Sequence, residues 1–187
     1  MGRPTRHWLL FAAGAATTLP RVGTAADPAP SEAEVKAEYV ERFTRFIEWP
    51  AGAQPAPNSP FVVCTSGESA LSTQLGRSLL GRRIKDHPVS VRRLGEDQEP
   101  SGCHILYLAP GTREHVAQIV EGLRGKPILS VGDATGFADL GLIINLFVDE
   151  QQHVRFEINP ETARASGLQI SAKLMTLAKR SPSRARE

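Results

Sequence analysis

Residue types that usually mark a metal centre are scarce in this sequence. Its 187 residues include two cysteines, two tyrosines, two tryptophans and five histidines, and aromatic residues make up only 6% of the chain. A structural zinc site needs four converging ligands, and the histidines form no closely spaced pair that could supply two of them. The sequence therefore predicts no metal site and no cofactor. The histidines are His7, His87, His104, His115 and His153.

Catalytic motifs are missing as well. The chain has no Gly-x-Ser-x-Gly sequence, which would mark a nucleophile elbow. Residues 122–127 contain a Gly-Lys pair, but their two glycines are too close for a phosphate-binding loop, and Pro127 stands where Ser or Thr is needed. The acidic residues are scattered, with no spacing that nominates a catalytic pair. We therefore expect no catalytic residues and no enzymatic activity.

The N-terminus carries the three parts of a cleavable export signal. Arg3 and Arg6 form a basic start, residues 8–19 are mostly apolar, and residues 24–26 are small enough for cleavage after Ala26. The apolar stretch is shorter than the roughly 20 residues that cross a bilayer. The alternative, a buried helix of the fold, is disfavoured by Pro20. We therefore expect residues 1–26 to be a signal peptide and the mature chain to be exported.

Export changes the charge balance of the protein. Residues 1–26 contain three arginines and no acid, so the formal net charge of +2 for the whole chain becomes −1 for the mature chain. Residues 179–187 are predicted to be a disordered tail, and they hold four basic residues and one acid. Without this tail, the formal net charge of residues 27–178 is about −4. Nucleic-acid-binding domains usually carry a basic face. We therefore expect no nucleic-acid partner.

Cys64 and Cys103 both lie in the mature chain. In an oxidising compartment an even pair of cysteines is a candidate disulfide. Closing a loop of about 39 residues would stabilise the fold by roughly 4 kcal/mol in the chain-entropy model. The alternative is two buried free thiols, which would be the better interpretation in a cytosolic protein.

Hydrophobic periodicity predicts helices that alternate with strands. Apolar stripes predict helices over residues 31–49, 68–80 and 112–123, and a Ser31-x-x-Glu34 capping box opens the first of them. Short apolar or β-branched runs predict strands at residues 61–65, 103–108 and 128–131, and the alternation of Val89 and Val91 with polar residues predicts another at residues 88–94. Such alternation is typical of an α/β sheet that is covered on both faces.

The C-terminal third predicts a β-hairpin from residues 142–148 and 153–158, followed by short helices near residues 161–166 and 171–179. No repeat or second core is evident. We therefore expect one three-layer α/β domain over residues 27–178. Its sheet should be mostly parallel, with an antiparallel hairpin near the C-terminal end and helices on both faces.

Four stretches of the sequence are similar, in order, to those of a known family. They are Phe43-Thr44-Arg45-Phe46-Ile47-Glu48-Trp49-Pro50; residues 81–94 with Cys103-His104-Ile105-Leu106-Tyr107; Ile128-Leu129-Ser130-Val131-Gly132-Asp133 leading to Gly136-Phe137-Ala138; and Val154-Arg155-Phe156-Glu157-Ile158-Asn159 with Gly167-Leu168-Gln169-Ile170-Ser171. Together they resemble the YfiR family of periplasmic proteins. The resemblance covers residues 33 to 179, and the ordered set is more specific than any single piece.

The resemblance implies a single α/β domain, often a homodimer, with no catalytic role. The family's best-understood members are periplasmic repressors that bind the periplasmic part of a membrane-bound diguanylate cyclase and hold down cyclic-di-GMP synthesis. For this protein the resemblance implies two binding partners. One is the periplasmic domain of a membrane diguanylate cyclase or sensor kinase, and the other is an outer-membrane lipoprotein that could sequester the protein. Cys64 and Cys103 fall where the family's common disulfide lies. A second pair found in some members is replaced by Ala138 and Asn145, so only one bridge is expected.

A repressor of this kind would act by binding one conformation of its target, through a few apolar anchors. The candidate anchors are Phe46, Trp49, Leu168, Ile170 and Leu174. Ordinary core packing is the alternative for each of them. Three arginines, Arg92, Arg93 and Arg155, are candidates for the rim of the contact or for the solvated sides of strands.

A small-ligand sensor is the alternative function. The glycine-rich turn from Asp133 to Ala138 follows a predicted strand, and α/β folds tend to bind ligands at strand ends. This hypothesis places the pocket near that turn.

Overall fold

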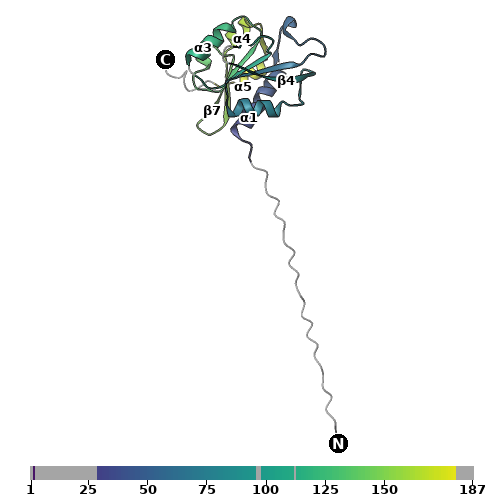
Figure 1. The fold of residues 1–187 in the computed structure, drawn as a ribbon. Helices are drawn as coiled ribbons and strands as arrows, with labels where there is room; N and C mark the ends of the chain where they lie inside the picture. The colour runs from purple at the N-terminus through teal and green to yellow at the C-terminus, as the bar shows by residue number, and fades with distance from the viewer. Residues whose placement is uncertain (1, 3–28, 96–97, 112, 180–187) are drawn as a thin grey trace.

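The computed structural model describes residues 2, 29–95, 98–111 and 113–179 (Figure 1). The predicted signal peptide, apart from Gly2, and residues 180–187 of the predicted tail lie outside the described residues. The strands are β1 (Ile47–Glu48), β2 (Phe61–Ser66), β3 (Arg83–Ile84), β4 (His87–Leu94), β5 (Ile105–Leu108), β6 (Leu129–Gly132), β7 (Ile144–Val148), β8 (Val154–Ile158) and β9 (Gln169–Ile170). The α-helices are α1 (Glu32–Phe43), α2 (Ala70–Ser78), α3 (Arg113–Gly122), α4 (Pro160–Ala165) and α5 (Ala172–Leu177).

Seven strands form the main sheet, in the order β3-β4-β2-β5-β6-β7-β8. The five strands from β4 to β7 run parallel, whereas β3 and β8 pair antiparallel at the two edges. The expected C-terminal hairpin is β7–β8, in which Leu146 lies opposite Phe156. The prediction of a mostly parallel α/β sheet with an antiparallel hairpin is confirmed.

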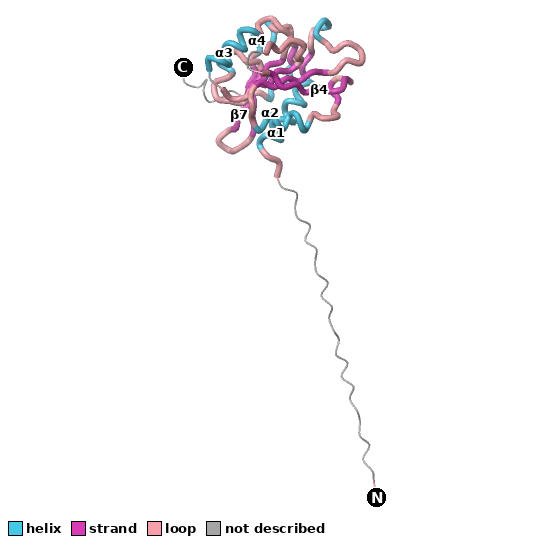
Figure 2. Tube along the Cα trace, in the orientation of Figure 1, coloured by secondary structure: helices cyan, strands magenta, loops and turns pink. Residues whose placement is uncertain are grey.

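Side chains alternate across the sheet and so divide the core into two clusters. On β5, Ile105 and Tyr107 belong to the cluster beneath α1 and α2, whereas Leu106 and Leu108 belong to the cluster beneath α3. Figure 2 shows α1 and α2 on one side of the strands and α3 on the other. The domain therefore has the predicted three layers, with helices on both faces.

The first helix is shorter than its apolar pattern predicts. The Ser31 side chain and the Glu34 carboxylate form the expected capping box, but α1 ends at Phe43 and a 3-10 turn follows, Thr44–Phe46. Ile47 and Glu48 are extended instead, because they pair with Ile170 and Gln169 to form the separate two-stranded sheet β1–β9. The apolar spacing predicted a helix up to Trp49, because such spacing carries no information about this long-range pairing.

Candidate functional site

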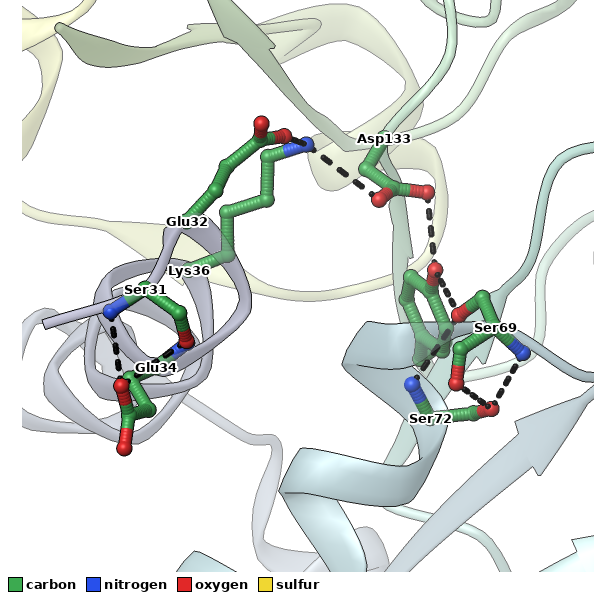
Figure 3. Close-up of polar contacts among 8 residues, drawn as sticks. Ser31, Glu32, Glu34, Lys36, Ser69, Ser72 and Asp133 are labelled. Atoms are coloured by element: carbon green, nitrogen blue, oxygen red, sulfur yellow. Dashed lines mark hydrogen bonds and ion pairs between the residues drawn. The ribbon is translucent and has the colours of Figure 1, made fainter.

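A chain of polar side chains crosses the carboxyl ends of β5 and β6 (Figure 3). The Tyr107 hydroxyl donates to Asp133 Oδ1 at 2.8 Å and lies 2.9 Å from Ser69 Oγ. Lys36 Nζ contacts Asp133 Oδ2 at 3.3 Å and Glu32 Oε1 at 2.6 Å. These bonds connect α1, the start of α2 and the ends of two strands.

The polar chain lies largely out of contact with solvent. The side chains of Lys36 and Asp133 are 6% and 10% exposed, and Tyr107 is fully buried. Burial and the neighbouring Asp133 carboxylate raise the pKa of the Tyr107 hydroxyl, which therefore stays protonated and acts as a donor. Both oxygens of Asp133 are engaged by the protein's own groups. The network fastens helices to the sheet and holds no activated nucleophile.

This arrangement bears on the ligand pocket that the sequence suggests near Asp133–Ala138. Asp133 points to Tyr107 and Lys36, while Phe137 and Ala138 are buried in the cores. Gly132 is tightly enclosed, since a Cβ added there would lie 2.8 Å from the Phe137 ring. The turn is thus packed by the chain itself.

Cys64 and Cys103 form a disulfide on the opposite face of the sheet, with Cα atoms 5.8 Å apart. Cys64 lies on β2 directly beside Arg92 of β4. The Arg92 guanidinium donates to the carbonyl of Ser101 and lies 3.2 Å from Cys103 Sγ. The bridge therefore ties β2 to the connection between β4 and β5, with Arg92 packed beside it.

The positions of the family's second cysteine pair are both buried. Asn145 on β7 donates to the carbonyl of Ala134 and to Glu157 Oε1, each at 3.1 Å, and Ala138 is 3% exposed. Asn145 is therefore held in the core by hydrogen bonds to Ala134 and Glu157.

The five candidate anchor residues divide into two groups. Trp49, Leu168 and Leu174 are 3%, 1% and 3% exposed, so these three pack in the core, which is the alternative that the sequence left open for them. Trp49 packs edge-on against Phe61 and donates through Nε1 to the carbonyl of His104. Phe46 and Ile170 are only half-buried and stay available at the surface.

The half-buried anchors lie together beside the two-stranded sheet. Ser171 N donates to the carbonyl of Phe46 at 2.9 Å, and Lys173 Nζ lies 5.8 Å from the Phe46 ring centroid. An adjacent hollow of about 270 Å³ is lined by Pro160, Ala163, Arg164, Leu168, Gln169, Ile170 and Met175. We call this hollow, with Phe46, the β1–β9 groove.

The three arginines that the sequence suggested for the rim of the contact make other contacts in the structure. Arg93 pairs with Glu68 at 2.7 Å, and Arg155 pairs with Asp149 at 2.8 Å, both away from the residues that line the groove. Arg92 packs against the disulfide. Arg164, which sequence reasoning missed, is the exposed cation that lines the groove.

Within the part of the chain that the structure describes, no three His, Cys, Asp or Glu side chains gather closely enough to hold a metal ion. Nor does any helix in these ranges have the length and apolar character needed to cross a bilayer. His104, the residue before β5, is itself engaged, because its Nδ1 accepts from the Val62 amide at 2.9 Å.

Among known proteins, a solved structure has a similar fold and a family model matches most of this chain. None of the curated proteins compared with it matches. A crystal structure of a conserved domain protein from Vibrio cholerae superposes with a TM-score of 0.50 at 13% identity, over 80% of this chain and 60% of that one. At this identity the likeness concerns the fold alone. A family model described as YfiR/HmsC-like matches residues 33–179. The chain belongs to the YfiR/HmsC-like family.

Proposed function

We propose that the mature chain is a periplasmic, non-enzymatic regulator. It binds the periplasmic part of a membrane-bound diguanylate cyclase, or of a similar sensor, and represses cyclic-di-GMP signalling. The observation that carries the proposal is the family match over residues 33–179, which spans the whole folded domain. The Cys64–Cys103 disulfide supports export, because such bonds persist in oxidising compartments.

The β1–β9 groove is the surface on which we place the partner. Ile170 and Met175 offer half-buried apolar area around a hollow that a partner's side chain could fill, and the half-buried Phe46 is joined to this region through its carbonyl, which accepts from Ser171 N. Arg164 and Lys173 are exposed beside it, so an acidic rim on the partner would complement the groove. Interfaces of this type depend on a few apolar anchors surrounded by polar contacts.

Binding of the mature, oxidised chain to the purified periplasmic segment of a diguanylate cyclase tests this proposal by calorimetry. We expect saturable binding, and Ile170→Asp should weaken it by about 2 kcal/mol or more, since a charge would enter an apolar contact. Because Ile170 also pairs with Ile47, the exposed Arg164→Glu provides a second variant that leaves the fold intact.

Two matched substitutions on α2 and its end serve as controls. Leu80 is 83% exposed and Arg77 is exposed, and neither lines the groove. Leu80→Asp and Arg77→Glu should therefore bind as the unmodified chain does. Absence of binding to any cyclase or sensor-kinase segment would refute the proposal, and equal losses in the control variants would place the contact elsewhere.

A further inference from the structure

The topology of the sheet contains a switch point between β2 and β5. From β2 the chain crosses through α2 to β4 on one side, and then returns past β2 to β5 on its other side. All three strands are parallel, so their carboxyl ends meet at one edge. In open α/β sheets, ligands bind in the crevice outside these ends, where the strand order reverses.

The carboxyl ends of β2 and β5 lie close together. Ala109 N donates to the carbonyl of Ser66 at 2.9 Å. Gly67 has φ +80°, and a Cβ added there would lie 3.0 Å from the Ala109 Cβ, so this approach favours glycine. Outside them lies a cavity of about 370 Å³, within the usual size range of small-ligand sites, lined by residues that include Ser66, Glu68, Arg93, Leu94, Ala109 and His115. We call it the switch-point cleft.

The floor of the cleft is apolar and its mouth is charged. Leu94, Leu108 and Val116 are buried beneath it, and Ile119 is half-buried. Ser66, Leu94, His115 and Ile119 also line a second hollow of about 260 Å³, which extends along α3 as far as Lys126. The cleft therefore continues into a second hollow whose lining is mixed, with Leu94, Leu106 and Ile119 beside polar side chains such as Gln118.

The charges at the mouth come in exposed pairs. At the mouth of the cleft, Arg93 and Glu68 are joined at 2.7 Å with side chains 60% and 82% exposed, and in the second hollow Lys126 lies 3.8 Å from Glu99. Exposed ion pairs of this type contribute little free energy, so a ligand carboxylate can replace the Glu68 carboxylate on Arg93 at small cost. Because each cation has an acid beside it, a monoanion is favoured over a dianion.

We propose that the switch-point cleft binds a small organic monoanion, with its carboxylate on Arg93 and its apolar body on Leu94 and Ile119. This site shares no lining residue with the β1–β9 groove. It therefore stands or falls independently of the proposed partner contact.

Sodium phenylacetate is a suitable probe, because it combines one carboxylate with an apolar ring. In a titration of the mature, oxidised chain followed by amide NMR, we expect saturable shifts at Gly67, Arg93 and His115 with a Kd of about 1 mM. The neutral isostere phenylacetamide should bind at least about fivefold more weakly. Phenyl phosphate, a dianion, should not bind more tightly than phenylacetate.

Two variants should change the affinity in opposite directions. Arg93→Gln should weaken phenylacetate binding by about fivefold, whereas Glu68→Gln should strengthen it by about twofold, since a competing carboxylate is removed. Both side chains are exposed, so the fold should be unaffected, and the exposed Arg83→Gln, on β3 opposite Pro88 at the other end of β4, is the matched control. Unsaturated shifts up to about 20 mM, shifts confined to the β1–β9 groove, or equal affinities in all variants would overturn the proposal.

Discussion

The two faces of this sheet are crosslinked by different chemistry. On the face of α1 and α2, hydrogen bonds and an ion pair connect four side chains, those of Lys36, Asp133, Tyr107 and Ser69. On the face of α3, a covalent bridge joins β2 to the connection before β5. The first attachment depends on the protonation and pairing of side chains, the second on redox state. Stability should therefore respond to different perturbations on the two faces.

Loss of the disulfide should have the largest effect on this comparison. The Cys64→Ser/Cys103→Ser variant should lose roughly 3–4 kcal/mol of unfolding free energy, because the unfolded chain is no longer constrained. Urea unfolding with circular dichroism measures the loss, and reduction of the unmodified chain should reproduce it. A loss below about 1 kcal/mol would mean that the bridge contributes little to holding the α3 face.

Breaking the buried ion pair should come next. Lys36→Met leaves Asp133 buried without its cation and should cost about 3 kcal/mol. Arg42→Met is the matched control, because the Arg42–Glu38 pair on the same helix is exposed and should contribute less than about 0.5 kcal/mol. Urea unfolding of both variants checks this. Equal losses would show that burial of the polar chain does not matter.

Removing a single hydroxyl should have a smaller effect. Tyr107→Phe keeps the ring in the core but deletes the donor to Asp133, and we expect a loss of about 1–2 kcal/mol. Tyr39→Phe, in a half-buried ring of α1, should lose less than about 0.5 kcal/mol. In a double-mutant cycle, the losses of unfolding free energy caused by Tyr107→Phe and Asp133→Asn should be non-additive, because the two side chains bond each other. The losses caused by Tyr107→Phe and by the Cys64→Ser/Cys103→Ser variant should be additive.

Acid should weaken the domain gently through His104. Burial lowers the pKa of His104, and the Val62 amide donates to its unprotonated Nδ1. The unfolded chain therefore binds a proton first, so stability is full above the unfolded pKa of about 6.5 and falls as pH drops below it. Urea midpoints measured across this range should show the decrease, and His104→Gln should flatten it. A midpoint that rises on acidification would contradict this account.

Much of the fold follows from local pattern. The strands β2, β4, β5 and β6 are short apolar or β-branched runs, and the Ser31–Glu34 capping box marks the start of α1. The β1–β9 pairing was missed because it joins residues more than a hundred positions apart, and periodicity reports only on neighbours. The end of α1 at Phe43 is a consequence of the same pairing.

The candidate site was less accessible to sequence reasoning. Phe46 and Ile170 were named, and for Trp49 the sequence left core packing and partner contact both open, because a position near a helix end does not show which neighbours will cover the side chain; the structure places it in the core. The polar chain was missed entirely. Its one signal was Lys36, a cation at the spacing of the apolar stripe that continues through Val40 and Phe43.

The cellular level of cyclic-di-GMP is the most direct test of the proposed repression of a membrane diguanylate cyclase by this chain. Deleting the gene should raise the nucleotide level, and restoring the chain or its Leu80→Asp variant should lower it again. The Ile170→Asp variant should fail to restore repression while its disulfide stays formed. An unchanged cyclic-di-GMP level in the deletion strain would contradict the account.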